Sequence, residues 1–264
     1  FHKVNRNGIR KLDLLNTSES FINTKYIDFE ESNSQYLSRT SVAGFITDSF
    51  TVSAWVKLES LKPTQQVLLN FGYSNSPGPY QKRWSFLLGP ITGLLHGYIF
   101  DANDPSSTYV TAVAPGAIPL AEWTHVVFTA KNCNNATFRE LKLYINGEAT
   151  PDVGGEDGDA DRLTLSTATR TLTVGGASPG FGDFDGGMDE VSYWNTALTA
   201  DDIKEIYQGS SGVYGAPGAG PGNLNAHTKK SRLISWWRMG DATDDDLTAG
   251  TANGVRDIGL NEFN

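Results

Sequence analysis

Short segments in which apolar and polar residues alternate recur along this chain, and they constrain its fold more than any other feature of the sequence. In FTVSAWVKL, residues 50–58, every second side chain from Phe50 to Leu58 is apolar, and Trp55 falls on the opposite face. The same alternation occurs at residues 66–72, 83–89, 124–130, 141–147, 170–176 and 189–195. These segments are rich in β-branched and aromatic residues and are bounded by Gly, Pro, Asn or Asp, which is typical of short strands. We therefore predict an all-β sandwich or barrel.

One segment, TADDIKEIYQG at residues 199–209, has the period of a helix. Thr199 fits the N-cap, and the two aspartates of the first turn oppose the positive end of the helix dipole. Ile203 and Ile206 share one face, which we expect to pack on the sheet. A single helix of this length cannot hold a domain, so it is predicted to cap the sandwich.

The composition is that of a globular protein and narrows the choice of partners. Of 264 residues, 39% are hydrophobic and 19% are charged, and 21 Lys and Arg against 30 Asp and Glu give a formal net charge of −9. A surface this acidic repels phosphate backbones, so we expect no nucleic-acid partner. No apolar run reaches the ~20 residues of a membrane-spanning helix, so we expect no membrane insertion. The single cysteine, Cys133, cannot form an intrachain disulfide.

The C-terminal part of the sequence changes character twice. Residues 209–230 are rich in Gly, Pro, Ser and Ala and lack apolar periodicity, so they are predicted to be a linker. Alternation returns in RLISWWRMGD, residues 232–241. A lone strand with two tryptophans is not stable by itself, so it must dock on the same sandwich or on a neighbouring chain.

Six segments occur in an order that is typical of one family: YIDFEESNSQYL (26–37), SFTVSAWVKL (49–58), EWTHVVFTA (122–130), LKLYINGE (141–148), TLTVGG (171–176) and GGMDEVSYWNTALTADDIKEIY (186–207). Together they resemble a laminin-G-like member of the concanavalin A-like lectin/glucanase superfamily over about residues 22–208. The resemblance implies an all-β, two-sheet antiparallel jelly-roll sandwich, often with one structural calcium. It also implies a role mostly in adhesion and recognition.

One departure from the family pattern concerns the strand LISWWRMGD. Family members usually carry such a strand before the equivalent of YIDFEES, whereas here it follows the domain. Either the tail folds back into the same position of the sheet, as in a circular permutation, or it adds to another copy by strand exchange. The WWRMGD strand is also similar to strands in jelly-roll structural proteins of marine bacteriophages.

The expected organisation has four parts. They are an N-terminal arm at 1–21, a laminin-G-like jelly roll at 22–208, the linker at 209–230, and a C-terminal strand and tail at 231–264. The expected setting is extracellular or on a virion surface.

An enzymatic role would require paired carboxylates. Glycosidases of this superfamily carry a Glu-x-Asp-x-x-Glu type of motif on one strand, where alternation directs the acids into the cleft. Asp28 and Glu30 share a face but lack the leading Glu, and Asp189 and Glu190 fall on opposite faces. We assign no catalytic residue and predict that the chain is not an enzyme.

The resemblance implies a metal site. It places Asp189, which opens the last strand of the domain, near Asp28 of the N-terminal turn. Carbonyl groups of Ser32 and Asn33 would complete an oxygen shell of the kind that Ca²⁺ prefers. The alternative is that Asp189 only caps a hairpin and Glu190 pairs with a surface cation.

Glycan binding would use aromatic side chains on exposed loops or on an open face, flanked by planar polar groups. The candidate ligand-binding residues are Tyr73, Tyr80, Trp84, Tyr109, Phe181 and Phe184.

We therefore predict a calcium-stabilised, non-catalytic recognition or adhesion module that binds glycan or protein. The alternatives are a purely structural protein of a virion or surface assembly, which includes homo-oligomers, and a diverged glycoside hydrolase.

Overall fold

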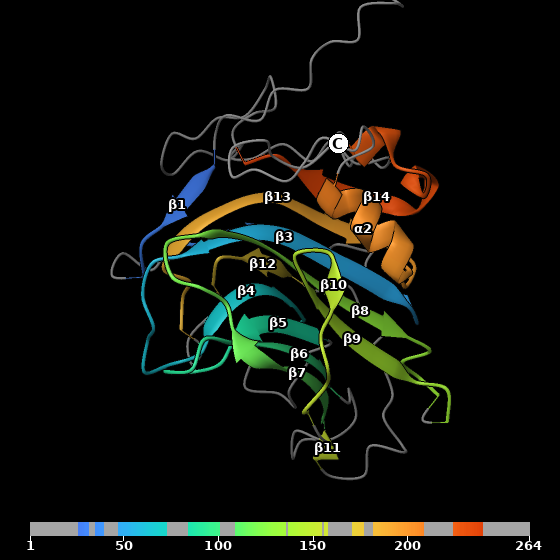
Figure 1. Cartoon of the computed structure of the whole chain (residues 1–264), viewed down its shortest axis with the longest axis horizontal. Helices are drawn as coiled ribbons and strands as arrows, with labels where there is room; N and C mark the ends of the chain where they lie inside the picture. Colours follow the sequence, from blue (N-terminus) through green and yellow to red (C-terminus); the bar gives the residue numbers. More distant parts are fainter. Residues whose placement is uncertain are drawn as a thin grey trace, which may run out of the picture.

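The computed structural model describes residues 26–31, 35–39, 47–72, 84–100, 109–135, 137–154, 156–157, 171–176, 182–208 and 224–239. They form two antiparallel sheets packed face to face, with one helix outside (Figure 1). The predicted two-sheet sandwich with one capping helix is confirmed.

Sheet A runs in the order β1–β13–β3–β8–β9–β10, and β14 also pairs with β13. Its strands are β1 (Ile27–Phe29), β3 (Phe50–Leu58), β8 (Trp123–Lys131), β9 (Glu140–Ile145), β10 (Glu148–Ala149), β13 (Gly186–Trp194) and β14 (Leu233–Trp237).

Sheet B runs in the order β11–β7–β6–β5–β4–β12–β2. Its strands are β2 (Leu37–Arg39), β4 (Gln66–Phe71), β5 (Trp84–Leu88), β6 (Leu94–Phe100), β7 (Tyr109–Ala117), β11 (Glu156–Asp157) and β12 (Leu172–Val174).

The core lies between the two sheets and is rich in aromatic rings. Phe50 of sheet A stacks on Trp84 of sheet B, with ring centroids 5.2 Å apart, and meets Phe128 edge to face at 5.6 Å. Gly97 of β6 makes room for Phe128, because a Cβ at that position would lie 2.4 Å from the ring. Alternation along each strand therefore sends one set of side chains into this core and the other set to an outer face.

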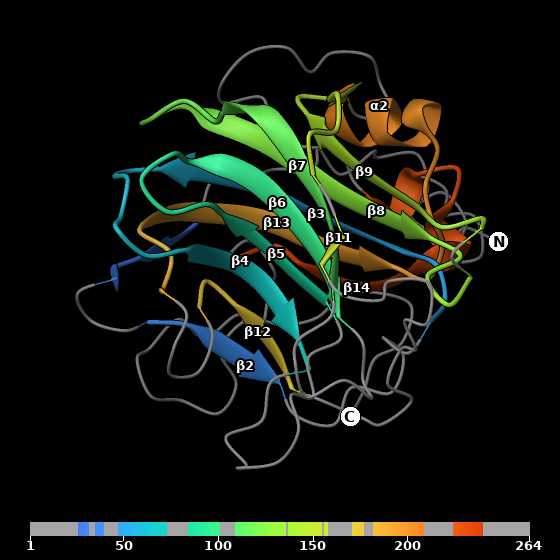
Figure 2. The same cartoon turned by 90° about the horizontal axis from the view of Figure 1, so that it is seen from below.

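The outer face of sheet A is covered by the helix α2 (Ala200–Gln208) and by the C-terminal segment 224–239 (Figures 1 and 2). Ile203 and Ile206 pack in one apolar cluster with outward-facing residues of sheet A and with β14. This burial explains why the predicted helix forms with its isoleucines toward the sheet. None of the helices in the described ranges is long and apolar enough to span a membrane.

The N-terminus of α2 is capped by its own first residues. The backbone N–H of Asp202 donates to Thr199 Oγ1 at 3.3 Å, and Asp202 Oδ2 accepts from the backbone N–H of Thr199 at 2.9 Å. The reciprocal arrangement satisfies donors that a helix leaves free at its start. Thr199 is therefore the N-cap, as predicted.

The segment predicted as a linker is in part folded. Leu224 and His227 are buried, at 2% and 3% exposure, and residues 224–232 form two short turns of 3₁₀-helix, η4 (Leu224–Ala226) and η5 (Lys230–Arg232). The prediction of a linker up to residue 230 is wrong for this part. The buried side chain of Leu224 packs this segment against α2. A single apolar residue produces no periodic pattern, so the sequence alone does not reveal this contact.

β1 and β14 occupy one strand position along the edge of β13. β1 pairs with Gly186–Met188, and β14 pairs antiparallel with Val191–Trp194 of the same chain. Between the two paired regions β13 is irregular, and Glu190 has a positive φ of 51°. In this structure the C-terminal strand thus completes its own sandwich.

Candidate functional site

A row of polar side chains crosses sheet B on its outer face. The strand register places each member directly opposite the next, from β2 to β7. In that order the members of this polar row are Ser38, Thr173, Asn70, Ser85, Tyr98 and Thr111. Their neighbours along each strand point into the core, so alternation alone directs the polar row outward.

Aromatic rings border the polar row on β6 and β7. Tyr98 stacks on His96 and on Phe100, each at 5.7 Å between centroids, and meets Tyr109 edge to face at 5.3 Å. We call these four residues the aromatic stripe. Apart from Phe100 they are partly exposed. Such rings offer flat apolar surfaces with polar edges, which suits ligands that are apolar on one side and hydroxylated on the other.

The central strands of the site carry no formal charge near neutral pH. Burial lowers the pKa of the His96 imidazole, and burial raises the pKa of the Tyr98 phenol, so both groups are neutral at pH 7. The Nδ1 atom of His96 lies 3.2 Å from Tyr98 Oη. Strands β4, β5, β6 and β7 contain no Asp, Glu, Lys or Arg.

Two polar groups of the row are buried and find no hydrogen-bond partner among the described residues. Ser85 donates its hydroxyl proton to Asn70 Oδ1 at 2.6 Å, which leaves Asn70 Nδ2 unpaired. Thr173 Oγ1, on the adjacent strand, is also unpaired. Asn70 is 3% exposed and Thr173 is 5% exposed. Buried groups of this kind are rare and call for an explanation.

The structure separates the six predicted ligand-binding residues. Tyr109 lies in the aromatic stripe. Trp84 and Phe184 are 0% exposed members of the core, so the prediction is wrong for both. β5 directs Trp84 inward by alternation, and Phe184 fills the core from the stretch before β13. Tyr73, Tyr80 and Phe181 lie outside the described residues.

The predicted metal ligands are only partly brought together. Asp28 stands opposite Gly187, two residues from Asp189, so the two carboxylates are diagonal neighbours on the outer face of sheet A. The charge of Asp28, with burial, raises the pKa of nearby Glu59, so this corner is negative. Ser32 and Asn33 lie outside the described residues, and in the described ranges no three acidic, His or Cys side chains converge on a metal position. The residues present therefore fit part of a calcium shell.

A lysine already neutralises part of the same corner. Lys62 Nζ lies 3.2 Å from Asp185 Oδ2 and 3.4 Å from Glu31 Oε2. Asp185 also accepts a hydrogen bond from the Ser60 hydroxyl at 2.6 Å. Asp185 is thus a structural partner of Lys62.

Glu190 is a buried partner of the C-terminal segment. Its carboxylate accepts hydrogen bonds from Trp236 Nε1 and, at 3.5 Å, from Arg238 Nε. Asp189 Oδ1 accepts from the backbone N–H of Glu190 at 2.8 Å, which holds the irregular turn in β13. Burial and the charge of Asp189 raise the pKa of Glu190 well above its usual range. The alternative expected Glu190 to pair with a surface cation, whereas Glu190 is 2% exposed and is held by Trp236 and Arg238 of the C-terminal segment.

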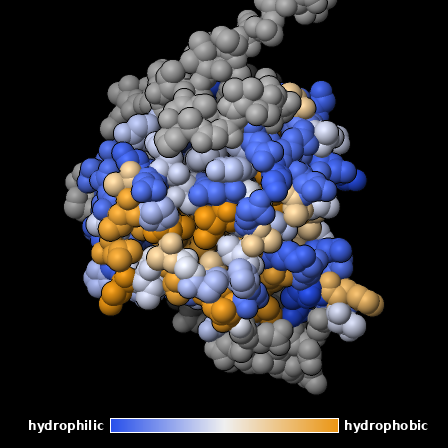
Figure 3. Space-filling model, viewed as in Figure 1, coloured by the Kyte–Doolittle hydropathy of each residue, from blue (hydrophilic) through white to orange (hydrophobic). Residues whose placement is uncertain are grey.

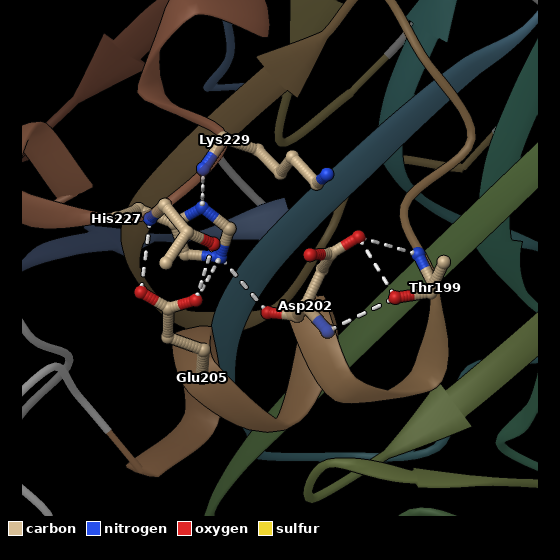
Figure 4. Close-up of polar contacts among 6 residues, drawn as sticks. Thr199, Asp202, Glu205, His227 and Lys229 are labelled. Atoms are coloured by element: carbon tan, nitrogen blue, oxygen red, sulfur yellow. Dashed lines mark hydrogen bonds and ion pairs between the residues drawn. The ribbon is translucent and has the colours of Figure 1, made fainter.

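A second polar cluster fastens the C-terminal segment to α2 (Figure 4). His227 Nε2 donates to the Asp202 carbonyl at 2.9 Å, and its Nδ1 accepts from the backbone N–H of Lys229 at 2.9 Å. Glu205 accepts from the backbone N–H and the hydroxyl of Thr228 at 2.9 and 2.7 Å. All of these groups hold protein to protein, so this cluster is structural.

Sequence reasoning missed most of the polar row. Thr173, Asn70 and Ser85 come from three distant segments, and no local pattern marks them. The aromatic stripe did leave a signal, because His96, Tyr98 and Phe100 alternate in LLHGYIF with inward-facing residues.

Comparisons with known proteins agree with the fold. The profile of the family described as "Concanavalin A-like lectin/glucanases superfamily", Laminin_G_3, matches residues 31–204. Among curated proteins, the chain is 24% identical over 192 residues to C-reactive protein 1.4 of Limulus polyphemus, covering 69% of this chain and 72% of that protein.

The solved structures that are similar to this one include the following two. A Bacteroides ovatus protein that has been proposed to bind carbohydrate has a TM-score of 0.55 and 17% identity, covering 90% of this chain and 56% of that one. A heptameric SAP-like pentraxin from Limulus polyphemus has a TM-score of 0.47 and 18% identity, covering 80% of this chain and 87% of that one. The first of these supports the sandwich fold alone.

Proposed function

Because this chain belongs to the concanavalin A-like lectin/glucanases superfamily, we propose that it is a non-catalytic recognition or adhesion module that binds glycan on the outer face of sheet B. The observation that carries the proposal is the polar row, bordered by the aromatic stripe. A pyranose presents hydroxyls at its rim and C–H groups on its faces, and the row and the stripe match these two surfaces.

Catalysis is not part of the proposal, because its chemistry needs groups that these strands do not carry. Glycoside hydrolysis uses a pair of carboxyl groups on either side of the scissile bond. β4 to β7 contain no acidic residue. The same lack of charged groups favours neutral sugars over anionic ones.

The test is a glycan array probed with the intact chain and two tyrosine variants. Tyr98→Ala removes the centre of the aromatic stripe, and we expect it to weaken binding at least about tenfold, or about 1.4 kcal/mol. Tyr26→Ala is the matched control, because Tyr26 is 44% exposed and packs against Trp123 of sheet A, with ring centroids 5.1 Å apart. A folded wild-type chain that binds no glycan, or a Tyr98→Ala chain that binds as well as wild type, overturns the proposal.

We further propose that Ca²⁺ binds at Asp28 and Asp189 and that the module works extracellularly or on a virion surface. The support for calcium is the diagonal pairing of the two carboxylates in a negative corner. This site is on sheet A, so calcium would stabilise the fold without touching the glycan.

The alternative is an assembly role, in which the ligand is a protein or another copy. Exposed apolar side chains favour it: Leu61, Ile91 and Leu120 are 44%, 68% and 48% exposed. Their turns are joined, since the Ile91 N–H donates to the Lys62 carbonyl at 2.7 Å and the Ala121 N–H donates to the Leu58 carbonyl at 2.7 Å. Figure 3 shows apolar surface toward the side where β3 turns into β4. The assembly role is tested by comparing the sedimentation of the Ile91→Ser variant with that of wild type. Oligomers that form in wild type and are lost in the variant would support assembly.

A further inference from the structure

The two unpaired groups of the polar row lie side by side on neighbouring strands. Thr173 of β12 stands directly opposite Asn70 of β4, and Asn70 stands opposite Ser85 of β5. Ser85 donates its hydroxyl proton to Asn70 Oδ1. The trio therefore offers the two N–H donors of Asn70 Nδ2, the hydroxyl of Thr173, and the free lone pairs of Ser85 Oγ.

Unpaired buried atoms on sheet A have a different setting. Trp55 Nε1 and His125 Nδ1 also lack partners, but their rings lie under Tyr207 of α2, with centroids 5.7 and 5.9 Å from the Tyr207 ring. A residue of the protein itself therefore covers these two rings. Asn70 and Thr173 belong to strands β4 and β12 of sheet B, whereas α2 packs on sheet A (Figure 2).

The donors and acceptors of the trio suit a hydroxyl group. A sugar hydroxyl accepts one hydrogen bond and donates another, so it can accept from Asn70 Nδ2 and donate to Thr173 Oγ1 or Ser85 Oγ. An anionic group can only accept, and β4, β5 and β12 offer it no cation.

Ser85 stands directly opposite Tyr98, but the unpaired groups of Asn70 and Thr173 are too far from the aromatic stripe for one sugar ring. Asn70, Ser85 and Tyr98 lie on three successive strands in the same row. Two strand spacings of about 4.8 Å put the backbones of Asn70 and Tyr98 about 10 Å apart, which is wider than a pyranose ring. A ligand that uses both must have at least two sugar units and must run across the strands.

We infer that Asn70, Ser85 and Thr173 form a hydrogen-bonding subsite, separate from the stacking subsite at Tyr98, and that the two together select neutral oligosaccharides over monosaccharides. The inference rests on the proposed glycan-binding function. It assigns Thr173 as a specificity-determining residue, because no residue in the described part of the chain hydrogen-bonds to its hydroxyl.

The test is calorimetric titration with four neutral tetrasaccharides (cello-, laminari-, malto- and chitotetraose, the last in its N-acetylated form) and with glucose and N-acetylglucosamine. Thr173→Val is the main variant. We expect it to weaken tetrasaccharide binding about five- to tenfold. Its melting temperature in the absence of sugar should equal or exceed that of wild type, because the change removes an unpaired buried hydroxyl. Thr173→Ser keeps the hydroxyl and should bind like wild type.

Thr124→Val is the matched control, because Thr124 is 1% exposed on β8 of the other sheet. It should leave binding unchanged. If wild type binds a tetrasaccharide and Thr173→Val binds it equally well, a trapped water pairs the hydroxyl and the inference is overturned while glycan binding stands. Equal affinity for tetrasaccharide and monosaccharide also overturns it. If wild type binds none of the six sugars and the glycan array is blank, the proposed function fails, and this inference fails with it.

Discussion

The outer faces of the two sheets carry different side chains. On sheet A, the outward side chains Val127, Tyr144 and Trp194 are apolar or aromatic, and α2 and the C-terminal segment bury them. On sheet B, the outward side chains of the polar row are hydroxyls, an amide and a phenol, and the helix packs elsewhere. The comparison shows that the same alternation can build two different outer faces, one packed under the helix α2 and one that carries buried polar groups without the helix.

The largest expected effect comes from removing the cover of sheet A. Trp236 is 1% exposed and its indole N–H donates to Glu190, so Trp236→Ala should lower the free energy of unfolding by about 3–5 kcal/mol. Urea unfolding measures this loss. Trp236→Phe, which keeps a ring, should lose less.

Deleting residues 224–264 extends the same test. The truncated chain should melt lower than the intact one and should associate through its bare sheet. A truncated chain with the same melting temperature and the same size in solution would show that sheet A needs no cover.

Calcium removal should have the next largest effect on stability, and it should act through sheet A without changing glycan binding on sheet B. A ligand at 100 times its Kd stabilises the folded state by about 2.7 kcal/mol, so chelation should lower the melting temperature by about 5–10 °C. Asp28→Asn should already melt lower and should not respond to chelator. Glycan binding by the folded chain should persist in chelator, and a wild-type melt that chelator does not change refutes the calcium site.

The smallest expected effect is on the pH dependence of stability, and it acts through the buried carboxyl group of Glu190. Burial and Asp189 raise the pKa of Glu190, so the folded chain holds this proton more tightly than the unfolded chain. Stability should therefore fall as pH rises from the usual value of 4.5 through the raised one. Glu190→Gln keeps an acceptor for Trp236, and unfolding measured across this window should show a weaker fall than in wild type. Equal slopes would mean that Glu190 does not govern the pH dependence.

Most of the fold could be predicted because alternation is a local signal. The alternating segment 50–58 became β3, and the helix from Thr199 formed with its isoleucines inward, since each pattern is complete within one element. Trp84 shows the limit of such reasoning. A tryptophan next to Gly, Pro and Asn residues has the composition of a binding loop, but its strand turns it into the core.

The candidate site could not be predicted because it depends on the pairing of distant strands. Thr173 meets Asn70 across about a hundred residues of sequence, and the register between β12 and β4 is fixed only by the folded sheet. Glu190 likewise finds Trp236 only because β14 returns to β13. Each of these residues is ordinary within its own segment.

The shared strand position of β1 and β14 also sets how the module is held. β14 runs along β13 from Trp194 toward Val191, and β1 continues in the same direction from Met188 to Gly186, so the end of one strand faces the start of the other. A tether joined to the start of β1 or to the end of β14 would therefore attach at the same place along the edge of β13 in sheet A. Figure 1 places β1 and β14 on the far side of the sandwich from the outer face of sheet B. A module anchored in this way would direct the outer face of sheet B away from its anchor.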